Sequence, residues 1–298
     1  MQKGENALPV SGSRHGELQG PERLNVNMEQ QKDFFLEELS KYMATQRVAL
    51  VRHEGCTDST NRVLKELAKN GAKESQVVIA DEQTNGRGRL GRYFFSPKER
   101  GIYMSVLLRP DDKAYEMAPL TAWVAVAVAN AIEAVAGVRP GVKWVNDLIL
   151  NGKKVCGIMT ELSVKEDGNK VDYIIVGIGI NLSGNQEDFP EELKAIASSI
   201  EAETGVTVSR AQLVAEIIRE LDLLNENWQI ETPKYLEQYR KDCVTIGKEV
   251  RVLSPEGERA ATALSVEGDF SLLVRYDVGT TERVYSGEVS VRGLYGYT

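Results

Sequence analysis

The residues with the clearest chemical potential are the seven from Gly86 to Arg92, in which three arginines are interleaved with three glycines and one leucine. Arginine carries a permanent charge on a planar group that matches phosphate and carboxylate oxygens. Glycine lacks a Cβ, so its backbone N–H can approach a ligand closely. The pattern predicts a flexible loop that closes over an anion. A solvated basic turn or a nucleic-acid-binding tract would show the same composition.

Further polar clusters flank this loop. Upstream, the short side chains of Asp58-Ser59-Thr60-Asn61 directly precede or begin a predicted helix over residues 60–70. Ser59 or Asp58 would serve as its N-cap, and the same groups at a helix start can bind a polar ligand. Downstream lie Lys143-Trp144-Val145-Asn146-Asp147 and Asn151-Gly152-Lys153-Lys154. The clusters together favour a binding site.

The two downstream clusters are predicted to lie on one hairpin. Two strand-like runs, 142–150 and 154–162, are joined by Asn151-Gly152, which is a strong signal for a type I′ turn. The expected register pairs Ile149 with Lys154, Asp147 with Cys156 and Lys143 with Thr160. Because side chains alternate between the faces of a sheet, Lys143, Asp147 and Lys154 are expected on one face. Two cations and a carboxylate would converge there.

The remaining pattern predicts the segments that position these residues. Hydrophobic spacing predicts strands over 47–53, 76–80, 102–108 and 173–182, and helices over 29–42, 115–136, 209–228 and 233–241. The strand around Gly177 and Gly179 permits close approach of a ligand ring, but it lacks the third glycine of a dinucleotide fingerprint. From about residue 245, four short alternating runs predict a small all-β barrel.

Composition narrows the class of protein. The 298 residues carry a net charge of −8, which argues against a general polyanion binder. The three cysteines are far apart and lack metal-ligand spacing, so they are expected to be reduced thiols. The longest apolar run, 123–129, is too short to span a bilayer. We expect a soluble, cytoplasmic protein.

The ordered motifs resemble those of biotin protein ligases. The resemblance is carried by 58–61, 82–89, 143–147, 177–181 and the C-terminal barrel, and it covers roughly residues 45–292. The implied fold class is α+β, with a mixed or antiparallel sheet packed with helices as in class II synthetases and biotin ligases, plus a small C-terminal SH3-like β-barrel. The implied domains are a disordered tail over 1–27, a catalytic domain over 28–243 and the barrel over 244–298. The chain resembles the monofunctional class, which lacks an N-terminal DNA-binding domain. Val145 departs from the proline of many relatives.

The resemblance implies a reaction and a set of site residues. Biotin and ATP would form biotinyl-5′-AMP with Mg²⁺, and biotin would then pass to a lysine of a biotin carboxyl carrier domain. Lys154, Lys143 and Arg89 are the implied catalytic groups. The implied contacts to biotin or biotinyl-AMP are Ser59, Thr60, Asn61, Gln83, Gly86, Arg87, Gly88, Arg89, Lys154 and Gly157. Asn146, Asp147 and Asn181 are candidates for ATP or magnesium contacts, with Asp147 as the candidate metal ligand. No DNA or membrane partner is expected, and a homodimer is compatible with the resemblance.

Two alternatives stay open at this stage. A lipoate or octanoate ligase or transferase would share the fold and also acylate a carrier lysine, although the arginine-rich loop and the barrel favour biotin. A non-catalytic protein that binds an anion or nucleic acid is the alternative from a different class. The acidic net charge and the expected face of Lys143, Asp147 and Lys154 count against it.

Overall fold

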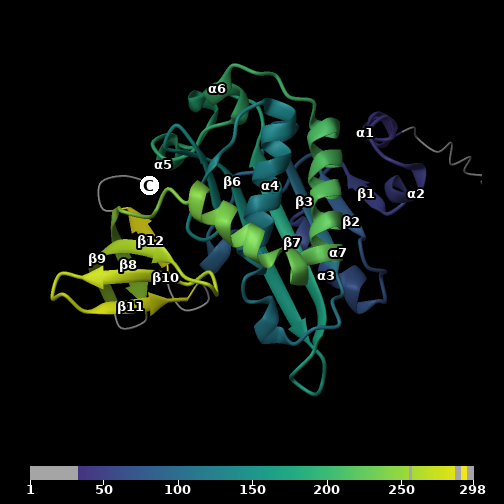
Figure 1. Ribbon diagram of the computed structural model, residues 1–298. Coiled ribbons are helices and arrows are strands. Elements are labelled where there is room, and N and C mark those ends of the chain that lie inside the picture. Colours follow the sequence, from purple (N-terminus) through teal and green to yellow (C-terminus); the bar gives the residue numbers. More distant parts are fainter. Residues whose placement is uncertain (1–32, 255–256, 286–289, 294–298) are drawn as a thin grey trace, which may run out of the picture. The chain divides into compact units, whose positions relative to one another are not determined.

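The computed structural model describes residues 33–254, 257–285 and 290–293. Its larger sheet has seven strands in the order β1-β2-β3-β7-β6-β5-β4 (Figure 1). The strands are β1 (Val51–Glu54), β2 (Val77–Ala80), β3 (Gly101–Leu108), β4 (Gly141–Lys143), β5 (Asp147–Leu150), β6 (Lys153–Val164) and β7 (Val171–Asn181). The β1–β2 pair is parallel and the other pairs are antiparallel. The predicted mixed sheet is confirmed.

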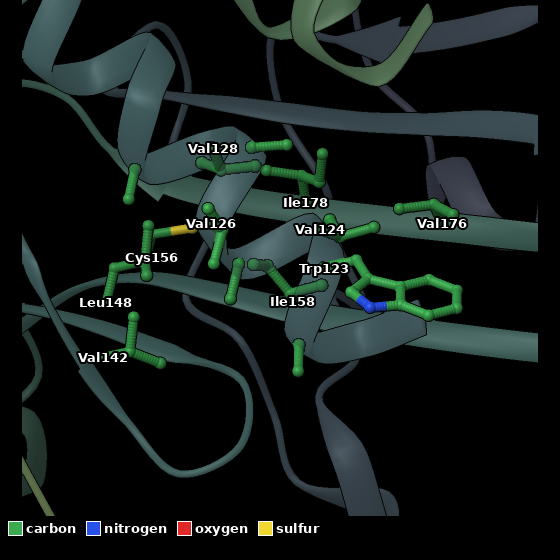
Figure 2. Packing of buried hydrophobic residues seen from close by; sticks show 14 of the residues in the cluster. Trp123, Val124, Val126, Val128, Val142, Leu148, Cys156, Ile158, Val176 and Ile178 are labelled. Atoms are coloured by element: carbon green, nitrogen blue, oxygen red, sulfur yellow. The ribbon is translucent and has the colours of Figure 1, made fainter. Parts of the chain in front are cut away.

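One face of this sheet is covered by α4 (Leu120–Ala136), and α7 (Arg210–Asp242) packs against α4. Figure 2 shows the valines of α4 meeting Ile158 of β6 and Ile178 of β7. The segment Ala114–Ala136 is long and apolar enough to cross a membrane, but 67% of its most apolar window is buried within the protein. Its apolar composition is therefore explained by its burial as a core helix.

The opposite face of the sheet is covered by α3 (Thr60–Lys69). Leu64 of α3 packs over Tyr173 and Ile175 of β7, whereas Ile174 and Val176 of the same strand belong to the α4 side. This is the alternation expected of a strand buried on both faces. The packing fixes the start of α3 beside the glycines of β7.

The N-terminal predictions need correction. Where a strand was predicted over 47–53, the chain forms a short helix, α2 (Thr45–Val48), before β1. Arg47 is held there by Asp222 at 2.8 Å and by the Ser75 carbonyl at 2.7 Å. Of the helix predicted over 29–42, residues 29–32 lie outside the described residues, and the described part forms α1 (Phe34–Leu39), which is capped by Asp33. The predicted tail, 1–27, lies outside the described residues.

Two further helices also differ from the prediction. The helix over 115–136 begins as a separate 3₁₀ turn, Ala114–Met117, with Pro119 at the N-cap of α4. The two helices predicted after Ser209 are one, because α7 continues through Pro233. The Thr232 hydroxyl donates to the Trp228 carbonyl at 2.6 Å in the turn before the proline. Ser209 caps α7 as predicted, accepting from the Gln212 N–H. The remaining short helices are α5 (Glu191–Lys194) and α6 (Ile200–Thr204), and the remaining 3₁₀ turns are Arg89–Gly91 and Gln186–Asp188.

The C-terminal residues form a second, antiparallel sheet in the order β11-β10-β9-β8-β12. Its strands are β8 (Glu249–Ser254), β9 (Gly257–Val266), β10 (Leu272–Tyr276), β11 (Thr281–Val284) and β12 (Ser290–Gly293). The fourth predicted run, 282–291, is divided between β11 and β12. The sheet is consistent with an SH3-like domain, while the domain limits at 27/28 and 243/244 stay predictions.

Candidate active site

The described residues enclose a cavity of about 200 Å³. It lies between the start of α3, the loop of residues 86–92 (the glycine–arginine loop) and the strands β5, β6 and β7. All but two of the site residues predicted from the sequence line this cavity. The predicted residues that line it are Ser59, Thr60, Asn61, Gln83, Arg87, Gly88, Arg89, Asn146, Asp147, Lys154, Gly157 and Asn181. Gly86 and Lys143 do not line it. The motifs that are separate in the sequence thus meet at one place.

One level of the cavity is built from amides and hydroxyls. The Thr60 backbone N–H and hydroxyl both donate to the Gln83 Oε1 atom, at 2.9 and 3.1 Å. The Gln83 Nε2 atom donates to the Ser96 hydroxyl at 3.1 Å, so the orientation of this amide is fixed at both ends. The Ser105 hydroxyl lies 2.8 Å from Thr60 Oγ1 and 2.6 Å from Asn61 Oδ1. These buried groups hold each other in place before any ligand binds.

The start of α3 contributes Ser59 in the predicted N-cap position. Its hydroxyl makes no capping hydrogen bond, and Asp58 instead accepts from the Ser59 N–H at 2.7 Å. Ser59 is buried and lines the cavity. The functional interpretation of this cluster therefore fits the geometry better than capping alone.

Glycines of β6 and β7 form a cavity wall that side chains would fill. A Cβ atom on Gly177 would lie 2.2 Å from Asn61 Oδ1, and one on Gly179 would lie 2.6 Å from the ring of Phe94. Gly157 pairs with Gly179 across the two strands. The absence of these Cβ atoms is what allows α3 and the Phe94 ring to approach the sheet.

A second level of the cavity carries charge. The Lys154 Nζ atom lies 2.7 Å from Asp147 Oδ1, and it sits 5.9 Å from the centre of the Phe94 ring. Asn146 donates from Nδ2 to the same Asp147 oxygen at 3.1 Å and to the Ile158 carbonyl at 3.0 Å. Asn146 Oδ1 in turn accepts from Arg89 at 2.9 Å. Two cations are therefore oriented at this level by a carboxylate and an amide.

The glycine–arginine loop is a small folded turn. The Gly88 N–H donates to the Arg92 carbonyl at 2.7 Å, and the Phe94 N–H donates to the Gly86 carbonyl at 2.9 Å. A Cβ on Gly86 would lie 2.3 Å from the Phe94 carbonyl, so Gly86 acts in the loop's packing. Burial lowers the pKa of Arg89, although the charge of nearby Asp147 opposes this shift. Arg89 also lines the cavity.

The predicted pairing of Lys143 with Thr160 was wrong, whereas its expected place on the same sheet face as Asp147 is kept. Residues 142–150 are two antiparallel strands, so Lys143 pairs with Asp147 across a turn. Trp144 in that turn is buried, and its indole N–H donates to the Phe270 carbonyl at 3.0 Å. The Asn151-Gly152 hairpin forms as predicted, with positive φ at both residues.

A β-bulge between Leu148 and Ile149 makes Asp147 face Gly157 where Cys156 was predicted. The predicted meeting of Asp147 and Lys154 is confirmed by their ion pair.

Some lining or supporting residues were not predicted. Phe94 and Phe189 line the cavity, and Ser96, Ser105 and Glu161 hold its polar side chains. Ser105 carried a signal, because it is a lone hydroxyl inside the apolar run 102–108. Asn181, a predicted residue that lines the cavity, donates to the Ser198 carbonyl at 3.0 Å.

The site has few groups that could hold a metal. No cluster of three or more His, Cys, Asp or Glu suited to a metal exists among the described residues. Asp147 is the carboxylate that lines the cavity, and its Oδ1 atom contacts the Asn146 amide nitrogen and the Lys154 ammonium. Mg²⁺ keeps several waters and binds through one or two carboxylates together with substrate phosphates, so Asp147 would be its ligand from the protein.

Known proteins resemble this chain over most of its length. Residues 55–181 match the model of the biotin/lipoate A/B protein ligase family. A bifunctional ligase/repressor BirA of Bacillus spizizenii is 37% identical, over 80% of this chain and 73% of its own length. A biotin–[acetyl-CoA-carboxylase] ligase of Mycobacterium tuberculosis is 32% identical, over 68% and 74%.

Comparison with solved structures also finds biotin protein ligases. The structure of a biotin protein ligase from Aquifex aeolicus in complex with biotin and ATP aligns with a TM-score of 0.69 and 27% identity, covering 82% of this chain and 98% of that one. The family match over 55–181 spans the predicted residues that line the cavity, from Ser59 to Asn181. On this evidence the chain belongs to the biotin protein ligase family.

Proposed function

We propose that the cavity binds biotin and ATP, forms biotinyl-5′-AMP, and passes the biotinyl group to a lysine of a biotin carboxyl carrier domain. The observation that carries the proposal is the division of the cavity into two levels along β7. Asn61 packs on Gly177, while Lys154 lies against Gly157, the partner of Gly179. Residues two apart on a strand are separated by roughly 6.5–7 Å.

This spacing suits the shape of biotin. A ureido ring needs hydrogen-bond donors and acceptors, which the Asn61, Thr60 and Gln83 level supplies. The carboxylate at the end of the acyl chain needs cations, which the second level supplies. The Phe94 ring, packed on Gly179 at the second level, gives apolar contact for the rest of the molecule.

In the first step, a biotin carboxylate oxygen attacks the α-phosphorus of ATP. A C–O–P mixed anhydride forms, and the bond to the pyrophosphate leaving group breaks. Negative charge on the phosphoryl oxygens grows in the transition state, and cations already aimed at it lower the barrier. Lys154 and Arg89 are held in place for this role by Asp147 and Asn146. Magnesium bound through Asp147 would neutralise part of the phosphate charge.

In the second step, the neutral amine of a carrier lysine attacks the anhydride carbonyl. An amide bond forms, AMP leaves, and the amine loses a proton. The glycine–arginine loop would shield the anhydride from water until that amine arrives. The proposal makes three further predictions: the protein forms a homodimer, it is located in the cytoplasm, and it does not bind DNA.

Biotin-dependent exchange of labelled pyrophosphate into ATP tests the first step. We expect exchange with biotin and magnesium, and at most background exchange with lipoate or octanoate. Preference for lipoate would establish the alternative ligase. Lack of exchange with every acid, by protein that is folded by circular dichroism, would leave a non-catalytic anion-binding protein as the better explanation.

A further inference from the structure

Glu161 of β6 lies behind the cavity and contacts two residues of α3. Its Oε1 atom accepts from Asn61 Nδ2 at 2.9 Å, and its Oε2 atom accepts from Lys65 Nζ at 3.0 Å. Burial raises the pKa of Glu161, but the hydrogen bonds from Asn61 and Lys65 outweigh it and leave the pKa below its ordinary value. At neutral pH the group is therefore a carboxylate with one oxygen turned to each neighbour.

The orientation of the Asn61 amide depends on this carboxylate. A carboxylate only accepts hydrogen bonds, so the end of the amide that faces Glu161 must be the NH₂ group. The Ser105 hydroxyl, 2.6 Å from Asn61 Oδ1, can donate or accept and would tolerate either orientation. Of the described contacts to Asn61, the one with Glu161 distinguishes the two orientations of the amide. An amide turned over would place its oxygen against the carboxylate.

We propose that Glu161 is a positioning residue, which holds the Asn61 amide with its oxygen on the Gly177 side of the cavity. There the oxygen can accept an N–H of the ureido ring of biotin. The inference rests on the proposed function of the cavity, to which it adds the group that sets the polarity of the biotin-binding level. Lys65 keeps the second carboxylate oxygen occupied from outside the cavity.

The Glu161→Gln substitution tests this polarity at constant size. Glutamine offers one oxygen to two donors, and the charged Lys65 forms the stronger hydrogen bond with it. The NH₂ group of the new glutamine then faces Asn61, whose amide turns over. In a chain that also carries Lys65→Met, the glutamine oxygen is free to accept from Asn61 again. The double variant should therefore recover what the single variant loses.

Kinetics of biotinyl-5′-AMP formation give the readout. We expect Glu161→Gln to raise the KM for biotin about tenfold, the loss typical of one hydrogen bond in a binding site. The KM for ATP and kcat should stay within about twofold. Lys65→Met alone should resemble the wild type, and the double variant should return to within about threefold of it. Glu66→Gln, which removes an exposed charge from the same helix where it pairs with Lys69, is the matched control.

An unchanged KM for biotin in Glu161→Gln would overturn the inference. So would a double variant no better than the single one, because Glu161 would then serve only to join α3 to β6. If Glu161→Gln does not fold, Glu161→Ala replaces it with the same expected loss for biotin alone, and a normal KM for biotin again refutes the role. A wild-type chain that forms no biotinyl-5′-AMP would instead refute the proposed function.

Discussion

Replacing Lys154 with alanine removes a cation that an ion pair with Asp147 holds in the cavity. The Lys154 ammonium lies 2.7 Å from Asp147, and its side chain is 23% exposed, so its charge is both oriented and partly shielded from water. Loss of one preorganised charge of this kind costs a factor of about 10²–10³ in rate. At 1.36 kcal/mol for each factor of ten, this corresponds to about 2.7–4 kcal/mol of transition-state stabilisation.

The same change leaves the Asp147 carboxylate without its ammonium partner. Asn146 Nδ2 still donates to it at 3.1 Å, so the expected loss of folding stability is about 1–3 kcal/mol. The fold should survive a loss of this size. A melting curve recorded beside the kinetics separates the effect on rate from the effect on stability.

The assay is single-turnover formation of biotinyl-5′-AMP at saturating biotin and ATP. Lys170→Ala is the matched control, because it breaks an exposed lysine–aspartate pair that is also 2.7 Å long and does not line the cavity. We expect wild-type rates for the control and a fall of about 10²–10³ for Lys154→Ala. A Lys154→Ala rate within about tenfold of the wild type would refute the role assigned to this lysine.

Three further outcomes are expected. Arg89→Gly should still form biotinyl-5′-AMP but release it, so that mass spectrometry finds biotin on bystander lysines; strict carrier specificity would argue against enclosure by the loop. Gly177→Ala would place a methyl group 2.2 Å from Asn61 Oδ1, so calorimetry should show biotin affinity at least about tenfold weaker; unchanged affinity would show that this wall is not in contact with biotin. Burial raises the pKa of Asp81, but hydrogen bonds led by that from His53 lower it below 3.8 overall. The contribution of Asp81 to folding stability is therefore complete above the unfolded pKa near 3.8, and it is lost as pH falls through the lower folded value. Asp81→Asn should make the stability less dependent on pH on the acid side. Identical urea midpoints for both proteins across pH 3–6 would contradict this.

Local signals in the sequence predicted many of the residues that line the cavity. Asn151-Gly152 fixed its hairpin because a type I′ turn depends on two adjacent residues with positive φ. Asp147 and Lys154 met despite the bulge between them, because long side chains reach across a register shift of one residue. The glycines of β7 were recognised as a place of close approach, and the ring of Phe94 does lie against Gly179.

The errors came from contacts distant in sequence. The turn after Lys143 is stabilised by Trp144, whose backbone N–H donates to Thr245 Oγ1 at 2.9 Å and whose indole reaches Phe270. Nothing near Trp144 in the sequence indicates those partners. Arg47, predicted to lie in a strand, lies in α2 and donates to Asp222, which is far along the chain. Patterns of hydrophobicity describe burial along the chain, whereas these ends of strands are set by tertiary hydrogen bonds.

The central claim is that this cavity activates biotin and delivers it to a carrier lysine. Intact-mass measurement of a purified biotin carboxyl carrier domain, after incubation with this protein, biotin, ATP and magnesium, tests it most directly. The account predicts a mass increase of one biotinyl group, which disappears when ATP is omitted or when the acceptor lysine of the carrier is replaced by arginine. A carrier of unchanged mass, or one modified equally well without ATP, would contradict it.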